Sequence, residues 1–399
     1  MKRFVSKELK YGASNYASKK VCISRGKGVF LYDTLGRKYL DFISAYSAVN
    51  QGHCHPRLLR IMNEQASQLT LTSRALHNKI LGQYMEKITS TFKYDMVLPM
   101  NTGVEGGETA IKISRAWGYK KKGVPPNKAV NLFCENNFWG RTLAACSSST
   151  DPSCYTNFGP YMKGFDIIPY NCITSFEKKI KENPNIVSIM LEPIQGEAGI
   201  IIPYNNYLKN IQKICKENNV LMIVDEVQTG LGRTGKMLAS DYEKIKPDIL
   251  ILGKALSGGM MPVSAVLADT HIMEVLTPGT HGSTFGGNPL ASAVAMEAIQ
   301  IIEDEDLVNN SFKMGNIFRS LLNNLDFPFI TDVRGKGLLN AVEFTNSEVT
   351  EKASLSLQKH GILAKSTRDN ILRFSPPLVI NEREIYLSMD LIERSFREI

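Results

Sequence analysis

A lysine at the end of an apolar run is the residue of this sequence best suited to covalent chemistry. Lys254 follows the run Ile249–Leu252 and Gly253, and small residues at 257–259 leave room for a second backbone or a flat ring. A lysine removed from water loses proton affinity, so its neutral amine can attack a carbonyl group and form a Schiff base. Taken alone, Lys254 is explained better by a side chain that reaches from a strand end to water.

Asp225 shifts that balance towards chemistry. It ends the apolar run Val220–Val224, and an isolated carboxylate buried there is costly without a cation beside it. The protonated pyridine nitrogen of a bound cofactor is such a cation, because the ring needs its positive charge to act as an electron sink. A structural ion pair with an arginine is the competing explanation.

A third candidate is a run of small residues that could hold a phosphate. Asn101–Thr109 precedes a stretch predicted to be helical, Ala110–Trp117. Free backbone N–H groups at a helix start, together with the helix dipole, favour an anion. Many glycine-rich helix starts share this composition, so the run is weak evidence on its own.

These residues follow runs that are typical of buried parallel strands. The middle of the chain alternates short apolar runs with longer amphipathic segments, as βαβ units do. Ligands of open α/β sheets bind at the carboxyl ends of the strands. One sheet edge should therefore collect Gly103, Phe138, Glu192, Asp225 and Lys254. The runs are Met96–Met100, Val130–Cys134, Ser188–Leu191, Val220–Val224 and Ile249–Leu252.

The whole pattern predicts an α/β fold with more than one domain, because 399 residues exceed what one core usually fills. We expect an N-terminal arm over 1–46, a large domain over 47–296 and a smaller α+β domain over 297–399. The supporting segments are a hairpin from Val29–Tyr32 and Tyr39–Phe42, a helix over Ala291–Glu305, strands over Leu338–Phe344 and Ile371–Phe374, and a helical tail.

Long motifs in the chain resemble those of the ornithine aminotransferases, fold-type-I enzymes that use pyridoxal 5′-phosphate (PLP) and act on terminal amines. The resemblance extends from Tyr11 to Leu378. It implies a large domain with a mostly parallel seven-stranded sheet flanked by helices, and a smaller C-terminal domain. The motifs are Ser47–His53, Asn137–Thr142, Glu192–Glu197, Asp225–Gly230 and Gly282–Pro289.

The resemblance implies how the cofactor is held. Lys254 would carry PLP as a Schiff base and act as general base and acid, while Asp225 would pair with the pyridinium. Phe138 and Val227 would pack on the two ring faces, and Gln228 would bond the phenolic oxygen.

It also implies a phosphate site shared between two subunits. Gly103 and Val104 would bind the phosphate through backbone N–H groups. Thr284 would reach the phosphate of the neighbouring subunit, which implies a homodimer with shared active sites.

Further matching positions concern the substrate. Tyr16 and Arg141 match residues that hold the α-carboxylate of ornithine, and a guanidinium suits a carboxylate in shape and charge. That grip would leave the δ-amine at the cofactor. Tyr46 matches the position associated with a preference for ornithine over 4-aminobutyrate.

Arg373 matches the arginine that binds the α-carboxylate of glutamate and 2-oxoglutarate. Glu197 matches the carboxylate that neutralises this arginine during the first half-reaction and releases it in the second. Glu192 resembles a residue that helps position this group. Such an internal ion pair suits one site that serves two differently charged substrates.

The implied reaction is a ping-pong transfer of the δ-amino group of L-ornithine to 2-oxoglutarate, giving glutamate-5-semialdehyde and glutamate. N-Acetylornithine or 4-aminobutyrate aminotransferases are the nearest alternatives. A non-catalytic binding protein of this fold is an alternative from another class, which the presence of both Lys254 and Asp225 disfavours.

Two motifs point elsewhere. Gly230–Met237 nearly matches a phosphate-binding P-loop of NTPases, but Met237 stands where Ser or Thr must bind Mg²⁺. His53-Cys54-His55 looks like a pair of metal ligands, but Pro56 follows and no further ligands lie nearby, so we expect no metal site.

Composition narrows the class of protein further. The net charge of +8 is spread along the chain, which disfavours nucleic-acid binding, and no apolar run could span a membrane. Seven cysteines without a Cys-x-x-Cys motif favour a reducing compartment. With the first residue close to Tyr16, we expect a cytoplasmic rather than a mitochondrial protein. Cys154 lies in a polar stretch and could be an exposed thiol. Such a thiol could be redox-active, but an inert surface cysteine is the simpler interpretation.

Overall fold

A seven-stranded sheet is the centre of the protein, whose computed structural model describes residues 2–399. Its strands are β4 (Met96–Met100), β5 (Val130–Cys134), β6 (Phe165–Ile168), β7 (Ile186–Leu191), β8 (Leu221–Asp225), β9 (Ile249–Leu252) and β10 (Ser264–Ala268). Their order is β4-β10-β9-β8-β7-β5-β6. The run from β9 to β6 is parallel, and β10 is antiparallel to both its neighbours. The predicted mostly parallel seven-stranded sheet is confirmed.

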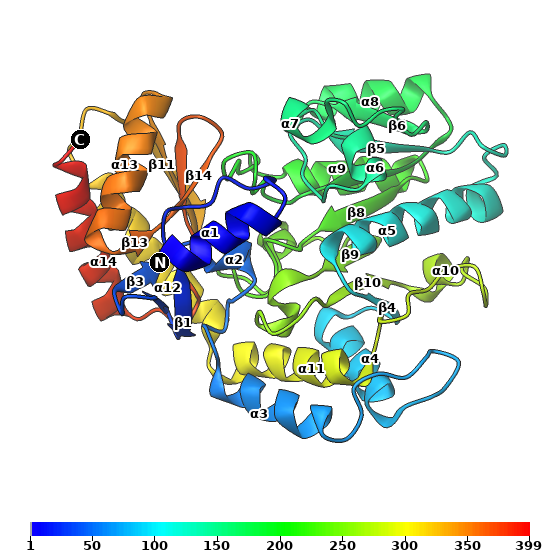
Figure 1. Cartoon of the computed structure of the whole chain (residues 1–399). Coiled ribbons are helices and arrows are strands. Elements are labelled where there is room, and N and C mark those ends of the chain that lie inside the picture. Colours follow the sequence, from blue (N-terminus) through cyan, green and yellow to red (C-terminus); the bar gives the residue numbers. More distant parts are fainter. Residues whose placement is uncertain (1) are drawn as a thin grey trace.

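Helices cover both faces of this sheet, as its uniformly apolar central strands require. Ile223 of β8 packs in the core under α5 (Gly103–Trp117). Met222 and Val224, its neighbours on β8, pack in the core under α8 (Ile173–Glu182) and α9 (Tyr207–Glu217). Figure 1 shows these helices on the two sides of the sheet.

A helical layer lies beyond the β4 and β10 edge. It is made by α3 (Pro56–Ala66), α4 (Lys79–Phe92) and α11 (Pro289–Asp304), which pack side by side at the bottom of Figure 1. Helix α11 begins two residues before the segment predicted to be helical, Ala291–Glu305, and ends one residue before that segment does.

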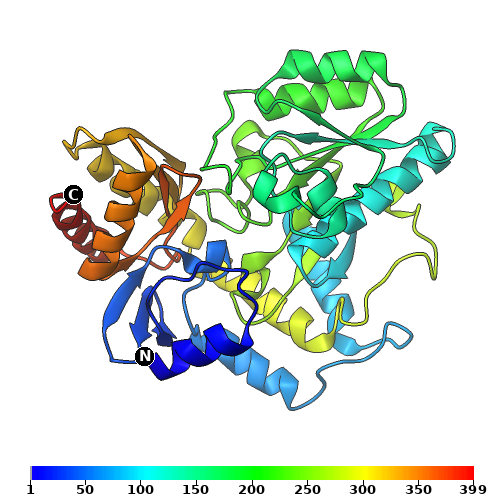
Figure 2. The same cartoon turned by 45° about the horizontal axis from the view of Figure 1, so that its top comes forward.

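The C-terminal part holds a separate antiparallel sheet of order β11-β12-β15-β14. Its elements are α12 (Leu307–Asn323), β11 (Ile330–Lys336), β12 (Leu339–Phe344), α13 (Ser347–His360), β14 (Lys365–Thr367), β15 (Ile371–Phe374) and α14 (Glu382–Phe396). Both Figure 1 and Figure 2 place this orange and red lobe beside the seven-stranded sheet. The predicted strands over Leu338–Phe344 and Ile371–Phe374 correspond to β12 and β15.

The N-terminal arm belongs to a third sheet. Its elements are α1 (Lys2–Tyr11), β1 (Ile23–Lys27), β2 (Phe30–Asp33), β3 (Lys38–Asp41) and α2 (Ser44–Ser47). Strands β2 and β3 form the expected hairpin. Strand β3 also pairs in parallel with β13 (Ile362–Leu363), so hydrogen bonds tie the arm to the C-terminal part.

Short segments complete the chain. They are the π-helix Gly118–Lys122, the α-helices α6 (Leu143–Ser147), α7 (Pro152–Tyr155) and α10 (Thr270–Met273), and the 3₁₀-helices Ala239–Glu243 and Lys254–Ser257.

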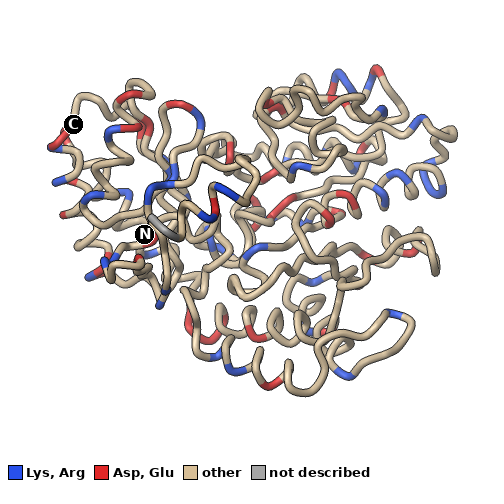
Figure 3. Tube along the Cα trace, in the orientation of Figure 1, with Lys and Arg blue, Asp and Glu red and all other residues tan. Residues whose placement is uncertain are grey.

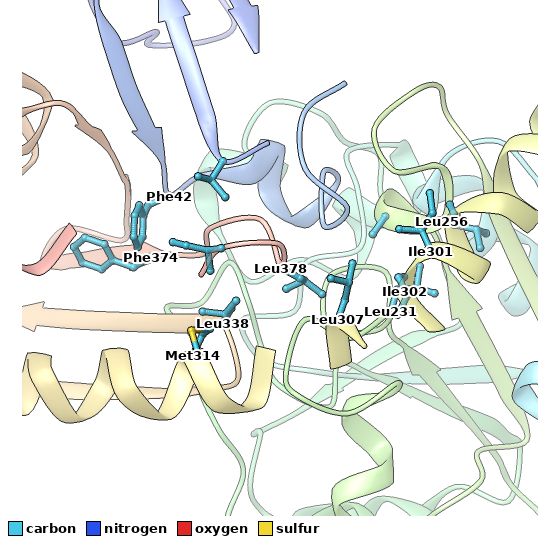
Figure 4. Close-up of a cluster of buried hydrophobic side chains, with 14 of the residues drawn as sticks. Phe42, Leu231, Leu256, Ile301, Ile302, Leu307, Met314, Leu338, Phe374 and Leu378 are labelled. Carbon is cyan, nitrogen blue, oxygen red and sulfur yellow. The ribbon is translucent and has the colours of Figure 1, made fainter. Parts of the chain in front are cut away.

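One continuous apolar core joins the lobes. Phe42 of the arm packs on Phe374 of β15, with ring centroids 6.0 Å apart. Figure 4 shows the same core extending through Leu338 and Leu378 to Leu256, beside the seven-stranded sheet, and to Ile301 of α11. The lobes are therefore held in a defined relation, which fixes the cavities between them.

Charged residues of both signs are interspersed over the lobes (Figure 3). Within residues 2–399, no helix is both long and apolar enough to cross a membrane.

Candidate active site

The chemistry centres on two neighbouring strand ends. Asp225 is the last residue of β8 and pairs with Ile251 of β9, after which Gly253 and Lys254 follow. Lys254 begins a 3₁₀-helix with a φ of +46°. Burial, only partly offset by Glu197 and Asp225, lowers the pKa of the Lys254 amine. Burial raises the pKa of Asp225 to about 6 although the Val227 N–H and Lys254 oppose the shift.

An inner cavity of about 230 Å³ lies in front of these two residues. It brings together most of the residues expected to hold the cofactor. Its lining includes Gly103, Val104, Phe138, Glu192, Glu197, Asp225, Val227, Gln228 and Lys254. Three other lining residues were not predicted, although all lie within the motifs Asn137–Thr142 and Asp225–Gly230: Trp139, Gly140 and Thr229.

The carboxylate of Asp225 is only partly satisfied. Its Oδ1 accepts the Val227 N–H at 2.9 Å, and the described residues offer Oδ2 no hydrogen bond. Gln228 Oε1 is likewise buried without a partner among the residues described. Both acceptors border the inner cavity, so they are available to a group bound there.

The first turn of α5 forms one end of the cavity. Thr102 and Glu105 make a capping box, in which the Glu105 N–H donates to Thr102 Oγ1 at 3.3 Å. Within the described part of the chain, the N–H groups of Gly103 and Val104 have no acceptor. A Cβ atom at Gly103 would lie 2.9 Å from Val227 Cγ1, so glycine lets the start of α5 approach the Val227 side chain closely.

Glu192 ties two cavity walls together. Its Oε1 accepts the Phe138 N–H at 3.0 Å and its Oε2 accepts the Gly196 N–H at 3.1 Å. Burial, with the nearby charge of Asp225, raises the pKa of Glu192 to about 8 against these two donors. A neutral Glu192 at physiological pH thus links the loop that carries Phe138 to the loop that carries Glu197.

Glu197 and Arg373 form an ion pair beside the cavity. Arg373 Nη1 lies 2.7 Å from Glu197 Oε1 and also donates to the Gly196 carbonyl oxygen at 3.1 Å. Gln228 Nε2 donates to the same Glu197 oxygen at 3.2 Å. Burial opposes ionisation of Glu197, but Arg373 outweighs it and lowers the pKa of the carboxyl group.

An outer cavity of about 1000 Å³ continues from the inner one towards solvent. Tyr16, Tyr46 and Arg141 line it, together with Glu197 and Lys254. The Arg141 guanidinium lies 5.8 Å from the centre of the Phe138 ring and has no ion pair with any described residue. It is thus an unpaired cation that can bind a carboxylate in the cavity that Lys254 also lines.

Tyr46 lies between Arg373 and the outer cavity. Its ring centre is 5.7 Å from the Arg373 guanidinium carbon. It belongs to α2, in which all four residues from Ser44 to Ser47 have positive φ. Such backbone is uncommon outside glycine and is often retained at functional sites.

Thr284 is a predicted site residue that the single chain does not bring to the others, whereas Arg373, which also lines neither of these cavities, is joined to them through Glu197. Thr284 lies in an exposed loop after α10 and lines neither cavity. Its assignment to a neighbouring subunit's site stays a prediction.

The expectation of a surface thiol at Cys154 is wrong. Cys154 lies in α7 with a relative exposure of 5%, and its carbonyl oxygen accepts a contact from Cys146 Sγ at 2.9 Å. The short helix α7, capped by Asp151, turns the thiol inward, which the polar composition of this stretch did not indicate.

The two other motifs have structural partners. His53 lies 2.7 Å from Asp41 and His55 lies 3.0 Å from Glu305, so the imidazoles face different carboxylates. No cluster of three metal-ligating side chains occurs within residues 2–399. Gly230–Met237 is a turn followed by a 3₁₀-helix rather than the α-helix of a P-loop, and its Arg233 is fully buried.

Known proteins resemble the chain over almost its whole length. Residues 11–396 match the family model described as aminotransferase class-III. A Drosophila melanogaster protein named ornithine aminotransferase, mitochondrial, is 53% identical over 98% of this chain and 90% of its own.

Solved structures are similar in fold as well. An ornithine aminotransferase from Toxoplasma gondii ME49 superposes with a TM-score of 0.97 at 46% identity, over 100% of this chain and 95% of the other. An acetylornithine aminotransferase from Elizabethkingia anophelis gives 0.92 at 48% identity, over 100% and 99%.

Proposed function

The chain belongs to the class-III aminotransferases, which use PLP, and on that premise we propose that it transfers the δ-amino group of L-ornithine to 2-oxoglutarate. The products are glutamate-5-semialdehyde and glutamate. The proposal rests on the cavity residues and on the identity to named ornithine aminotransferases.

The inner cavity fits PLP in its donors and acceptors. The half-satisfied Asp225 carboxylate suits the cationic ring nitrogen, and the free Gln228 Oε1 suits a phenolic group. The free N–H groups of Gly103 and Val104 at the start of α5 suit a phosphate. Phe138 and Val227 supply apolar surface for the ring.

When bound, PLP supplies a reactive carbonyl carbon and an electron sink. Burial lowers the pKa of Lys254, so a larger share of its amine is neutral at physiological pH and able to bond that carbon. The neutral Lys254 amine would also be placed in the cavity to take a proton from the substrate carbon and return it. The negative charge of Asp225 would favour the protonated form of the ring nitrogen.

Two arginines orient the two substrates. Arg141, with Tyr16 beside it in the outer cavity, holds the α-carboxylate of ornithine and leaves the δ-amine to point inward. Arg373 would hold the α-carboxylate of 2-oxoglutarate, and Glu197 covers it until then. Tyr46 packs beside Arg373 and also lines the outer cavity that contains Arg141.

The observation that carries the choice of ornithine is the 2.7 Å ion pair between Glu197 and Arg373. While Arg373 is neutralised, Arg141 is an unpaired guanidinium of the outer cavity that suits a carboxylate. An α-carboxylate held by Arg141 in the outer cavity would leave the far amine of the substrate to reach the cofactor. The similarity to the Elizabethkingia anophelis protein makes N-acetylornithine the second candidate.

The test is the absorbance of the PLP-loaded enzyme, to which L-ornithine is added alone. Loss of the PLP band, its recovery with 2-oxoglutarate, and release of glutamate-5-semialdehyde support the proposal. A larger rate with N-acetylornithine or 4-aminobutyrate would overturn the choice of substrate. The Lys254→Ala variant should bind PLP but should not show this loss and recovery of the band. Failure of the wild-type enzyme to bind PLP would contradict the roles of Lys254 and Asp225.

We further propose a homodimer in which Thr284 of each subunit serves the partner's phosphate site. The exposed position of Thr284 is compatible with such a contact. A cytoplasmic location is part of the proposal, since all seven cysteines are unpaired, as in proteins of reducing compartments.

A further inference from the structure

Lys365 is a cation at the active site that neither the motifs nor the proposed reaction uses. It begins β14 and lines the outer cavity together with Glu197 and Lys254. It also borders a small cavity lined by Tyr46, Gln228 and Arg373. The Lys365 ammonium group makes no hydrogen bond or ion pair with any residue in the described range 2–399.

The register of β14 directs Lys365 towards the Glu197 loop. Lys365 is opposite Arg373 on the antiparallel strand β15, so the two side chains leave the same face of the sheet. Thr367 shares that face because strand side chains alternate, and its Oγ1 donates to the Glu197 carbonyl oxygen at 2.8 Å. Ile371, opposite Thr367, packs on Ile194 and Ile200 of the same loop.

A second cation lies near Lys365. Lys19 Nζ donates to Ser354 Oγ at 2.6 Å, on the C-terminal lobe. Burial, and then the charge of Lys365, lower the pKa of Lys19 to about 8. The two amines therefore repel each other, and a carboxylate that pairs with Lys365 would relieve this repulsion.

Charge balance at the site changes between the two proposed half-reactions. While Arg373 is paired with Glu197, this carboxylate has the arginine as its cation and the Gln228 amide as a second donor. When the carboxylate of 2-oxoglutarate takes Arg373, Glu197 keeps the Gln228 amide and the charge of Lys254, the amine that the reaction needs in its neutral form. A largely buried carboxylate left without a cation is costly.

We propose that Lys365 receives the Glu197 carboxylate when Arg373 binds the α-carboxylate of 2-oxoglutarate. In that arrangement Lys365 pairs with Glu197, and Arg373 pairs with the α-carboxylate of 2-oxoglutarate. Lys365 is therefore a positioning residue that acts through Glu197, and it favours the second half-reaction over the first. This inference rests on the proposed function.

The first experiment compares the half-reactions in PLP-loaded Lys365→Met, followed by cofactor absorbance in single turnovers. Loss of a charge partner predicts that the apparent Kd for 2-oxoglutarate rises about tenfold, within the usual range of such couplings. The rate and apparent Kd with L-ornithine should stay within about twofold, since additive effects of unrelated sites are small. Lys365→Arg should restore most of the affinity. Lys352→Met, on the exposed face of α13, is the matched control.

A double-mutant cycle with Glu197→Gln separates this role from direct binding of the substrate. Without the carboxylate there is nothing for Lys365 to receive, so Lys365→Met should then change the 2-oxoglutarate affinity by less than about twofold. An undiminished effect in the Glu197→Gln background means that Lys365 binds 2-oxoglutarate directly and overturns the inference. Equal losses in both half-reactions, or none in either, overturn it as well.

The outcomes are separate from a failure of the proposed function. An enzyme that does not react with L-ornithine disproves the substrate assignment. The half-reaction with glutamate and 2-oxoglutarate still uses Arg373 and still tests Lys365 through the same cycle.

Discussion

Two buried carboxylates at the inner cavity differ in what they can do. Burial raises the pKa of Asp225 to about 6, so it is largely ionised at neutral pH. Burial and the charge of Asp225 raise that of Glu192 to about 8, so Glu192 is largely neutral. One acid can thus serve as an anion for a cationic ring, while the other holds two loops without adding charge.

The raised pKa of Asp225 predicts that Asp225→Asn stabilises the cofactor-free protein, whereas the same change should slow the loaded enzyme. Folded Asp225 binds its proton more tightly than unfolded Asp225 does, so it costs stability as the pH rises from about 4 through about 6. At pH 7.5 the cofactor-free variant should exceed the wild type by on the order of 1–3 kcal/mol in free energy of unfolding. The gain should vanish at pH 4.

Thermal unfolding across this pH range measures the effect. In the loaded enzyme the same substitution should reduce kcat by roughly 10²–10³ because the ring nitrogen loses its anion. A cofactor-free variant that is less stable at pH 7.5 would contradict the cost assigned to buried, ionised Asp225.

The site residues that pattern alone could locate are those at strand ends. Asp225 and Lys254 follow uniformly buried runs, and the sheet brings them together in the register those runs imply. Their detailed roles came from the resemblance. Lys365 could not be found in this way, because β14 is only three residues long and its importance comes from pairing with β15.

At the scale of elements, α5 depends on glycine for its place on the sheet. A Cβ atom at Gly107 would lie 2.5 Å from Trp139 Cε3, and the Trp139 indole is fixed by its hydrogen bond to Ser148 Oγ at 2.9 Å. The helix start that exposes the Gly103 and Val104 N–H groups is thus positioned by packing of a small residue on an aromatic ring.

Gly107→Ala should therefore destabilise the protein by about 1–3 kcal/mol and weaken PLP binding, because overpacking displaces α5. Gly82→Ala is the matched control in α4, where the new methyl group meets nothing within 4 Å. That change should stabilise by up to about 1 kcal/mol through helix propensity. Chemical unfolding and PLP titration of both variants give the comparison, and equal effects would refute the packing argument.

Several elements were not predictable from local pattern. The helix predicted from Ala110 begins at Gly103, because the capping box and packing override the low helix propensity of three glycines. Strand β10 could not be distinguished within an apolar, glycine-rich region of the sequence. Its antiparallel position between β4 and β9 depends on pairing with β4, which is far away in the sequence. Helix α12 was missed because Ser311 and Gly315 interrupt the apolar stripe on its buried face.

At the scale of the whole molecule, Arg233 links the large domain to the other lobes. Its Nη1 donates to the carbonyl oxygens of Leu338 and Pro376, and its Nη2 donates to Asn50 Oδ1 at 2.6 Å. Burial lowers its pKa to about 9 although Asp41 opposes the shift. The guanidinium thus satisfies acceptors from three distant segments at one buried point.

Arg233→Met should cost on the order of 3–5 kcal/mol, because it leaves several buried acceptors without a donor. Arg397→Met, on the exposed end of α14, should change stability by less than about 0.5 kcal/mol. Denaturant unfolding measures both. A loss in Arg233→Met no larger than in the control would show that water or neighbouring groups can replace the guanidinium.

The proposed sharing of sites between subunits makes a quantitative prediction about mixed dimers. Lys254→Ala abolishes the chemistry of its own subunit, whereas Thr284→Glu places a negative charge against the phosphate of the partner's site. Each homodimer should be inactive. In a mixed dimer both defects fall on one site and the other site keeps Lys254 and meets an unaltered Thr284. Random assembly of equal amounts should then restore about a quarter of wild-type activity, as expected for a two-fold interface with shared sites. If Thr284 served its own subunit, each site of a mixed dimer would carry one defect, and the mixture would stay as inactive as its parents.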